Sequence, residues 1–393
     1  MKKIFIDVTQ SCRSSNNSGI QVVTRRLYQE LEQLCQTTTV LWDNHIQRYC
    51  LLTDKEKNIL SNPFGKNYQA KARPNKQENP ILKDILSSLF RLGRLVSLDK
   101  PPRNGQVLFF PEVFRDKRVT ALKKSLHKEL KKIAIFHDAN VLKFPDITPP
   151  SKIKNFKSYL HFISTCDCIT CVSEESKIEF QKHLLERNNN CKIKVEHWPV
   201  ECPLNLPKPQ TSEKIIVLCV STLGYNKNHL TLLKAANQLW SKGMDFELEL
   251  IGQADFAWTP KVLKEINRLN EQGRPIKWLQ HVSQDTLEQK YANCSFTVYP
   301  SLFEGFGLPI LESLIRGKPC ICGNNGALGE VSNGGGCLRV SDQNDPKNLA
   351  DAMGNLLSDS TTLDKLKKEA SARDYGTWRS YATRMLEFVN SNK

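Results

Sequence analysis

The chain has 393 residues, with 56 lysines and arginines against 41 aspartates and glutamates, and its formal net charge is +15. This length favours two domains over one, and the apolar and charged fractions are typical of a globular protein. No stretch is apolar for long enough to cross a bilayer, and residues 1–7 lack the apolar core of a signal peptide, so we expect a cytoplasmic protein. The charge predicts an acidic partner: a phosphate ligand, an anionic membrane surface or nucleic acid.

The 13 cysteines fall mostly inside apolar runs, such as residues 218–220 and 319–322. Without a secretion signal, this pattern predicts buried and reduced thiols. Cys166, Cys168 and Cys171 superficially resemble half of a metal site, but they lie in a predicted buried strand and no partner cluster follows them. We therefore expect neither a metal site nor a bound cofactor.

The chain opens with the pattern of a β/α unit. Residues 2–8 are typical of a buried strand, and residues 19–31 predict an amphipathic helix that begins at Gly19 after a polar loop. The loop lacks Gly-x-Gly-x-x-Gly, so the fingerprint of a nicotinamide-binding site is absent. Residues 38–42 predict the next strand.

Residues 45–105 are predicted to be an irregular, lysine-rich insertion. Within it, residues 81–96 carry apolar side chains at helical spacing, with Lys83, Arg91 and Arg94 on the other side. A basic amphipathic helix can lie on a membrane surface, or it can be an ordinary helix packed on its own domain, which is the commoner case. Both interpretations stay open.

Two further strands of the first half end in side chains of interest. The strand predicted at residues 132–138 ends in His137, and a histidine at the carboxyl end of a parallel strand points into the ligand crevice unless its role is purely structural. Ser173 follows the strand predicted at 168–173 and precedes two glutamates, a pattern typical of a helix N-cap. Between the strand predicted at 106–110 and the His137 strand, we expect a basic helix surface of Lys117, Arg118, Lys123, Lys124, Lys128, Lys131 and Lys132.

Four prolines between residues 197 and 209 indicate a linker. We predict an N-terminal Rossmann-like domain at residues 1–200, a linker at 201–213 and a C-terminal Rossmann-like domain at 214–374. After the linker, alternating strands and helices restart, so two β/α domains in tandem are expected. The last helix, within residues 375–393, is expected to cross back to the first domain because its apolar face needs a partner.

The most informative stretch lies at residues 301–313. A strand is predicted at 296–300 and a helix begins at Pro309, so the Glu304-Gly-Phe-Gly307 loop lies where a parallel sheet binds ligands. Its glycines allow close approach to the backbone, and the first helical amides can hold anionic or hydroxyl oxygens. Glu304 and Glu312 suit a polyhydroxylated ligand, because a carboxylate can accept from two neighbouring hydroxyls. The alternative is that both acids merely favour the positive end of the helix.

The second half resembles retaining glycosyltransferases of family 4, of the bacterial surface-polysaccharide type. Glu304 and Glu312 match the paired-glutamate motif of that family residue for residue, and residues 220–230 resemble its phosphate-binding turn, with Lys227 at the lysine. The match is dense over 215–345, thin over 45–105, and weaker at Gly19, His137 and Ser173. The resemblance implies the GT-B fold, an α/β architecture of two Rossmann-like domains facing a central cleft.

The resemblance also implies roles for individual residues. Glu304 would hold donor-sugar hydroxyls, Glu312 the ribose, and His137 the donor sugar near the reacting centre. Lys227 would neutralise the leaving diphosphate, with Gly19 beside it. The catalytic residues expected in this way are His137, Lys227 and Glu304. The expected donor-binding residues are Gly19, Ser173, Thr222, Asn226, Lys227, Glu304, Gly305, Phe306, Gly307, Leu308 and Glu312.

The phosphate turn departs from the family pattern in one respect. Family members usually carry an arginine ahead of the lysine, and here the candidate positions hold Thr222 and Asn226. Asparagine can form hydrogen bonds but supplies no charge. Either a cation from elsewhere compensates, or diphosphate binding is weaker than in typical members.

The function expected from these features is metal-independent transfer of a mannosyl or glucosyl-type group from a nucleotide-diphosphate sugar, with retention. The expected acceptor is a glycan or lipid-linked glycan in polysaccharide or lipopolysaccharide biosynthesis, so the protein could sit peripherally on the inner face of a membrane. The alternatives are a weak or inactive GT-B protein that binds nucleotide sugars or membrane surfaces, and a sugar-nucleotide epimerase or phosphorylase. Nucleic acid is not an expected partner, because no aromatic residues interleave the basic ones.

Overall fold

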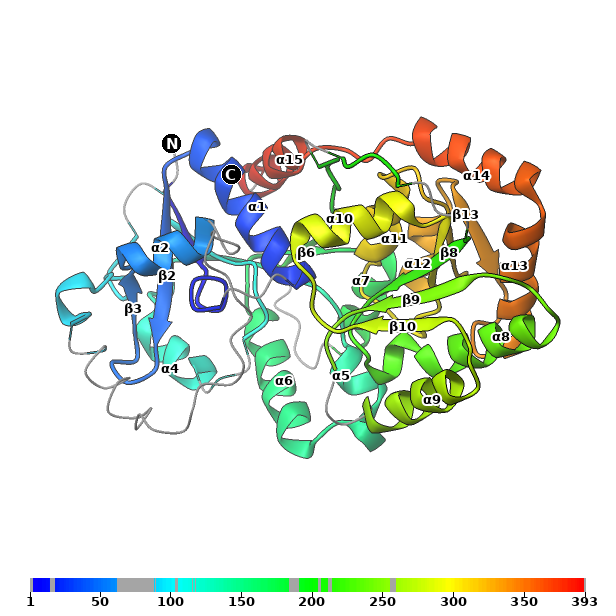
Figure 1. The fold of residues 1–393 in the computed structure, drawn as a ribbon. Coiled ribbons are helices and arrows are strands. Elements are labelled where there is room, and N and C mark those ends of the chain that lie inside the picture. The colour runs from blue at the N-terminus through cyan, green and yellow to red at the C-terminus, as the bar shows by residue number, and fades with distance from the viewer. Residues whose placement is uncertain are drawn as a thin grey trace. The chain divides into compact units, whose positions relative to one another are not determined.

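The chain folds into two compact units in the computed structural model, and each is described separately (Figure 1). Unit 1 comprises Met1–Trp198 and Trp378–Lys393, and unit 2 comprises Pro199–Thr377. The structure describes residues 3–14, 18–61, 88, 90–102, 105–114, 116, 118–183, 191–203, 206–210, 214–254 and 259–391. Among these, no helix combines the length and apolarity needed to span a membrane.

Unit 1 is built on a sheet with the strand order β3-β2-β1-β4-β5-β6-β7. All neighbouring strands are parallel except β3, which pairs antiparallel with β2 at the edge. The strands are β1 (Ile4–Asp7), β2 (Thr37–Asp43), β3 (Arg48–Leu51), β4 (Val107–Phe110), β5 (Lys131–Phe136), β6 (Cys168–Cys171) and β7 (Lys192–Val195).

The helices of unit 1 lie between these strands and at the end of the chain. They are α1 (Gly19–Leu34), α2 (Asp54–Ser61), α4 (Arg118–Ser125), α5 (Asn140–Lys143), α6 (Pro150–Ile163), α7 (Glu174–Lys182) and α15 (Trp378–Asn390), with short 3₁₀ turns η1 (Leu92–Arg94) and η2 (Pro145–Ile147). The C-terminal helix α15 packs beside α1 (Figure 1), and Arg379 Nε lies 3.0 Å from Glu30 Oε2. Its buried face includes Trp378, Tyr381 and Met385, so the last helix completes the core of the first unit.

Unit 2 is built on an all-parallel sheet with the order β10-β9-β8-β11-β12-β13. Its strands are β8 (Ile216–Val220), β9 (Glu247–Ile251), β10 (Ile276–Leu279), β11 (Phe296–Tyr299), β12 (Cys320–Gly323) and β13 (Cys337–Val340). Its helices are η3 (Tyr225–Lys227), α8 (His229–Ser241), α9 (Thr259–Glu271), α10 (Gln284–Asn293), α11 (Leu308–Leu314), α12 (Gly326–Ser332), α13 (Pro346–Ser358) and α14 (Ser360–Ala372).

Alternation along the strands of unit 2 produces two separate apolar layers. Val217 and Cys219 of β8 face a core that also holds side chains of α8, α9 and α13. Leu218, between them, faces the opposite side and packs with Tyr291 of α10 and Cys294. Because both faces of a parallel sheet are covered, strands such as β8 and β12 read as continuous apolar runs, and this is why they could be predicted.

The structure differs from the sequence-based expectations in several places. The insertion at 45–105 is not wholly irregular, since it contains β3 and α2, and strand β7 was not predicted at all. Arg118 is buried and therefore does not belong to a basic surface. Half of the helix expected at 81–96 lies outside the described residues. In the part that is described, Arg91 forms ion pairs with Asp43 and Glu56 within unit 1.

Candidate active site

The candidate site of unit 2 lies at the centre of its sheet. Strand order reverses between β8 and β11, which are hydrogen-bonded neighbours. The loops that leave their carboxyl ends therefore run to opposite sides and leave a crevice between them, the usual ligand position in such sheets. The loop after β8 carries Lys227 and the loop after β11 carries Glu304.

Lys227 and Glu304 meet across this switch point. Lys227 Nζ lies 2.5 Å from Glu304 Oε1 and 2.8 Å from the hydroxyl of Tyr299. That hydroxyl donates to Glu304 Oε1 over 2.8 Å, and the Ser301 hydroxyl contacts the same oxygen. Only 17% of the Lys227 side chain and 14% of the Glu304 side chain are exposed, so the pair is mostly shielded from water.

The contacts leave the two oxygens of Glu304 in different situations. In the described part of the chain, every recorded hydrogen bond of this carboxylate goes to Oε1, which leaves Oε2 to accept from a ligand. Burial and the Glu304 carboxylate raise the pKa of Tyr299 well above its usual value. The tyrosine therefore stays protonated and keeps its position as donor to Glu304.

The residues in place of the expected arginine do not supply a charge. Asn226 ties the two loops together: its carbonyl accepts from Leu302 N at 2.7 Å, and its Nδ2 donates to Phe303 O at 3.3 Å. Thr222 is exposed. Among the described residues with a recorded contact to the Glu304 carboxylate, Lys227 is the only cation.

The loop after Glu304 closes onto the start of α11. Gly305 and Phe306 are buried, Gly307 precedes the helix, and Leu308 is its first residue. Gly307 has φ +113°, a backbone conformation that disfavours any residue with a Cβ. The glycine therefore lets the chain turn abruptly into the helix, where Pro309 has no N–H and Ile310 N already donates to Gly307 O at 3.0 Å.

Glu312 lies farther along α11 than the sequence suggested. It is the fifth residue of the helix rather than a member of its first turn, and burial raises its pKa. Its carbonyl accepts from Arg316 Nη1 at 2.6 Å, and Arg316 in turn forms a two-point ion pair with Glu288 of α10. No recorded contact joins Glu312 to Glu304, so their shared role in binding one ligand stays a prediction.

Three predicted site residues belong to unit 1. His137 follows β5 and is 2% exposed, and its Nε2 donates to Pro111 O at 2.7 Å. Burial lowers the pKa of His137 to about 4, so the ring is neutral at physiological pH, and its buried Nδ1 has no partner among the described residues. Ser173 caps α7 by accepting from Ser176 N, as expected. Gly19 is exposed at the first position of α1.

Sequence reasoning missed several supporting residues of the unit 2 site. It did not assign Tyr299 or Ser301 a role, although both flank the strand end where ligands bind. Gln343 is buried, and its Nε2 donates to Ser301 O at 3.1 Å and to Asn325 Oδ1 at 2.7 Å. The backbone carbonyl of Gln343 accepts from Asn228 Nδ2 at 2.7 Å. Gln343 thus joins three loops that are distant in sequence, and no local pattern signals that role.

A second buried histidine borders the phosphate turn. His229 begins α8, and its Nε2 lies 3.2 Å from Ser221 Oγ. Burial and the nearby Lys227 lower the pKa of His229 to about 4. Within the residues that the structure describes, no group of three or more His, Cys, Asp or Glu side chains could hold a metal ion.

Known proteins resemble part of the chain in sequence and the whole chain in fold. The model of the family described as glycosyl transferases group 1 matches residues 205–373. O-antigen chain mannosyltransferase B of Escherichia coli is 29% identical over 257 residues, which are 63% of this chain and 65% of that protein. The serotype-specific mannosyltransferase WbdA of Escherichia coli is 25% identical over 206 residues, which are 48% of this chain and 25% of that protein. Less than two thirds of the length of either relative is therefore covered.

Solved structures resemble the whole chain at low sequence identity. Sucrose-phosphate synthase from Thermosynechococcus elongatus has a TM-score of 0.67 at 15% identity, covering 100% of this chain and 99% of that one. Anabaena HepE in complex with UDP-glucose has a TM-score of 0.67 at 16% identity, and both chains are covered completely. With the two parallel-sheet units, these likenesses confirm the expected GT-B fold. The match to the glycosyl transferases group 1 model is confined to residues 205–373, which lie within unit 2.

Proposed function

We propose that the protein is a retaining hexosyltransferase that moves a mannosyl or glucosyl-type group from a nucleotide-diphosphate sugar to a glycan acceptor. The observation that carries the proposal is the meeting of Lys227, Glu304 and Tyr299 at the switch point of the unit 2 sheet. One cation and one carboxylate with a free oxygen suit a ligand that combines negative charge with hydroxyl groups. A nucleotide-diphosphate sugar is such a ligand.

The proposed reaction breaks the bond between the sugar C1 and a phosphate oxygen, so negative charge develops on the leaving diphosphate. Lys227 is the side chain placed to neutralise this charge. Glu304 Oε2 would accept from sugar hydroxyls. Glu304 is not proposed as a covalent nucleophile. Its Oε1 accepts hydrogen bonds from Lys227, Tyr299 and Ser301, and these bonds stabilise the negative charge of the carboxylate.

The proposed substrates follow from the relatives and from charge. Two relatives are named as mannosyltransferases, one of them for the O-antigen chain, and the HepE structure contains UDP-glucose. We therefore propose a hexosyl donor and a glycan or lipid-linked glycan acceptor in surface-polysaccharide synthesis. The net charge of +15 would favour an anionic membrane surface beneath a lipid-linked acceptor. Co-sedimentation with anionic liposomes that disappears at high salt would support this location, and no binding at low salt would exclude it.

A thermal-shift screen against UDP, GDP, ADP, CMP and dTDP, each with and without an attached sugar, tests the donor site. A ligand that binds only the folded state stabilises it by RT ln(1 + [L]/Kd), so a true donor raises the melting temperature as its concentration rises. A shift with one nucleotide diphosphate, larger for its sugar form, supports the proposal. No shift with any nucleotide would indicate that the phosphate turn, which has Thr222 and Asn226 where family members usually carry arginine, does not bind a diphosphate. This result would favour an inactive protein.

Metal independence is tested separately. We propose that Lys227 takes the place of a divalent cation at the diphosphate. Transfer activity should then be unchanged in excess EDTA. Loss of turnover that Mg²⁺ or Mn²⁺ restores would contradict this part of the proposal and leave the donor class intact.

A further inference from the structure

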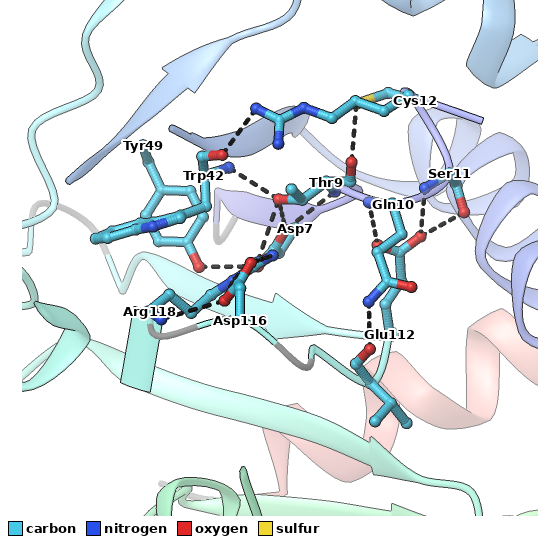
Figure 2. Close-up of polar contacts among 12 residues, drawn as sticks. Asp7, Thr9, Gln10, Ser11, Cys12, Trp42, Tyr49, Glu112, Asp116 and Arg118 are labelled. Carbon is cyan, nitrogen blue, oxygen red and sulfur yellow. Dashed lines mark hydrogen bonds and ion pairs between the residues drawn. The ribbon is translucent and has the colours of Figure 1, made fainter. Parts of the chain in front are cut away.

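The sheet of unit 1 has a switch point of its own. Strand order reverses between β1 and β4, just as it does between β8 and β11 in unit 2. The crevice of unit 1 is therefore bordered by the loop after β1, here called the β1 loop (residues 8–14), and by the segment after β4. Figure 2 shows the side chains that join these two segments.

Glu112 reaches from the segment after β4 into the β1 loop. Its Oε2 accepts from Gln10 N and its Oε1 accepts from Ser11 N, both at 2.8 Å, and the Ser11 hydroxyl also contacts Oε1 (Figure 2). The carboxylate thus holds two consecutive backbone amides. Glu112 is only 4% exposed, so water cannot replace these bonds.

The same loop is held from its other side by α1. Arg25 Nη2 donates to Ser11 O at 2.9 Å and to Ser14 O at 2.8 Å. The β1 loop therefore lies between a buried carboxylate that binds its amides and a buried guanidinium that binds its carbonyls. Such opposed bonds fix the backbone of a loop that is otherwise free to rearrange.

The connection between β1 and the segment after β4 does not depend on Glu112. Arg118 Nη1 lies 2.7 Å from Asp7 Oδ2, and the Tyr49 hydroxyl donates to the same oxygen over 2.9 Å. Trp42 N donates to Thr9 Oγ1 at 2.8 Å (Figure 2). Because this neighbouring network already joins the strand ends, Glu112 is specialised for the amides of the β1 loop.

Keeping a carboxylate at this position is costly. Burial, followed by the charge of Asp7, raises the pKa of Glu112 to about 7, and the bonds from Ser11 and Gln10 oppose that rise. An apolar side chain would avoid the desolvation cost but would leave two buried amides without acceptors. The carboxylate of Glu112 therefore stabilises the conformation of the β1 loop.

We propose that Glu112 is a positioning residue that holds the β1 loop in the conformation that binds the acceptor. The role rests on the proposed transferase function, in which the Lys227 and Glu304 site of unit 2 holds the diphosphate and sugar of the donor and the β1 loop of unit 1 receives the acceptor. The site is thus set by a residue that does not touch substrate. Glu112→Gln should disturb this loop, because each carboxylate oxygen accepts from one backbone amide, and in glutamine one of these two positions is an NH2 donor that cannot accept.

The test compares Glu112→Gln with Glu129→Gln, which neutralises an exposed glutamate of the same unit. Hydrogen–deuterium exchange in residues 8–14, measured without substrate, should be about tenfold faster in Glu112→Gln, as expected for the loss of one charge-assisted hydrogen bond. The KM for the acceptor should rise by a similar factor, while the affinity for the nucleotide sugar stays within about twofold of wild type. The Glu129→Gln control should match wild type in the exchange rate of residues 8–14, in the acceptor KM and in the affinity for the nucleotide sugar.

Ser11→Ala provides a milder test if Glu112→Gln does not fold, because it removes only the hydroxyl contact and should give smaller changes in the same direction. Unchanged exchange in residues 8–14, or loss of donor affinity with an unchanged acceptor KM, would overturn the proposal. Faster exchange in a protein whose wild type transfers no sugar would show that Glu112 fixes the β1 loop, but it would refute the transferase function and with it the link to an acceptor. The two failures are therefore distinguishable.

Discussion

The Glu304 carboxylate is held on one oxygen by Lys227, Tyr299 and Ser301 and open on the other. This arrangement separates two tasks. Oε1 fixes the side chain, and Oε2 is available to the ligand. A binding group whose own orientation is locked loses little entropy when it engages the ligand.

Glu304→Gln tests this separation. The glutamine keeps the size of the side chain but loses the charge that orients Lys227, and we expect transfer to fall roughly 10²-fold, as when a preorganised polar group is removed from an active site. Initial rates with donor and acceptor measure the effect, and thermal melting verifies the fold. Glu271→Gln, an exposed change in the same unit, is the control. Near-normal turnover in Glu304→Gln would remove this residue from the site.

Tyr299→Phe tests the bridge between Lys227 and Glu304. The ring stays in its buried position, but the hydroxyl that contacts both side chains at 2.8 Å is lost. We expect kcat to fall about tenfold, the effect of one lost hydrogen bond near a charged group. Tyr375→Phe loses a hydroxyl that donates to Ala370 O, outside the site, and should retain full activity. Equal rates in the two variants would show that the bridge is dispensable.

Predictability from sequence differed among residues of the same site. Glu304 and Lys227 could be predicted because each lies in a short local motif at a strand end. Tyr299 and Gln343 could not, because their roles depend on partners 72 and 42 residues away, which only the folded sheet brings near. The same holds for Glu112, whose amide partners lie 101 and 102 residues earlier.

At the scale of elements, burial decided which strands could be predicted. The central strands β1, β8 and β11 are apolar on both faces and stand out as continuous runs. Strand β3 (Arg48–Leu51) lies at an edge and is exposed at both ends, and β7 (Lys192–Val195) alternates lysine with aliphatic residues at the other edge. Edge strands take much of their definition from a neighbour, so local sequence signals them weakly.

The carboxyl end of β9 controls the start of the phosphate turn. A Cβ on Gly252 would lie 1.9 Å from Ser221 O, and Ser221 N and Leu223 N are bonded to Ile251 O and Gln253 O at 2.9 Å. Gly252 also has φ +151°. The glycine therefore lets β9 pass close to the backbone that leads into Lys227.

Gly252→Ala should lower the free energy of unfolding by about 3 kcal/mol or more, because backbone has to move away from the new methyl group. Urea unfolding measures the change. Gly273→Ala is the matched control, because Gly273 has φ +71° but nothing within 4 Å of its Cβ position. This variant should lower the free energy of unfolding by only about 1–2 kcal/mol, the cost of placing a residue with a Cβ in the left-handed region. Equal losses in both variants would mean that the β9 end can shift without strain.

At the scale of the whole molecule, the chain leaves unit 1 at Trp198 and returns to it at Trp378. Unit 1 is therefore completed only after unit 2 has been synthesised. The apolar face of the last helix indicated this return, since Trp378 and Met385 are buried beside the N-terminal part of the chain.

Each unit also contains a neutral histidine with a lowered pKa, His137 in unit 1 and His229 in unit 2. Because the folded pKa of about 4 lies below the usual value of 6.5, the unfolded chain binds more protons between these values. Each histidine therefore contributes stability that is present above about pH 6.5 and is lost as pH falls toward 4. Other buried groups titrate in the same range, so the contribution has to be isolated by comparison with a variant.

His229→Gln should reduce the loss of unfolding free energy between about pH 7 and pH 5 by roughly 2 kcal/mol relative to wild type. Urea unfolding at the two pH values, followed by tryptophan fluorescence, gives this difference. Any difference between the variant and wild type in stability at pH 7 cancels, because only the change with pH is compared. His45→Gln, at a residue outside the core, should leave the wild-type dependence intact. If His229→Gln and wild type lose stability equally, then His229 is charged in the folded protein, and the carboxyl end of β8 is wetter than its burial indicates.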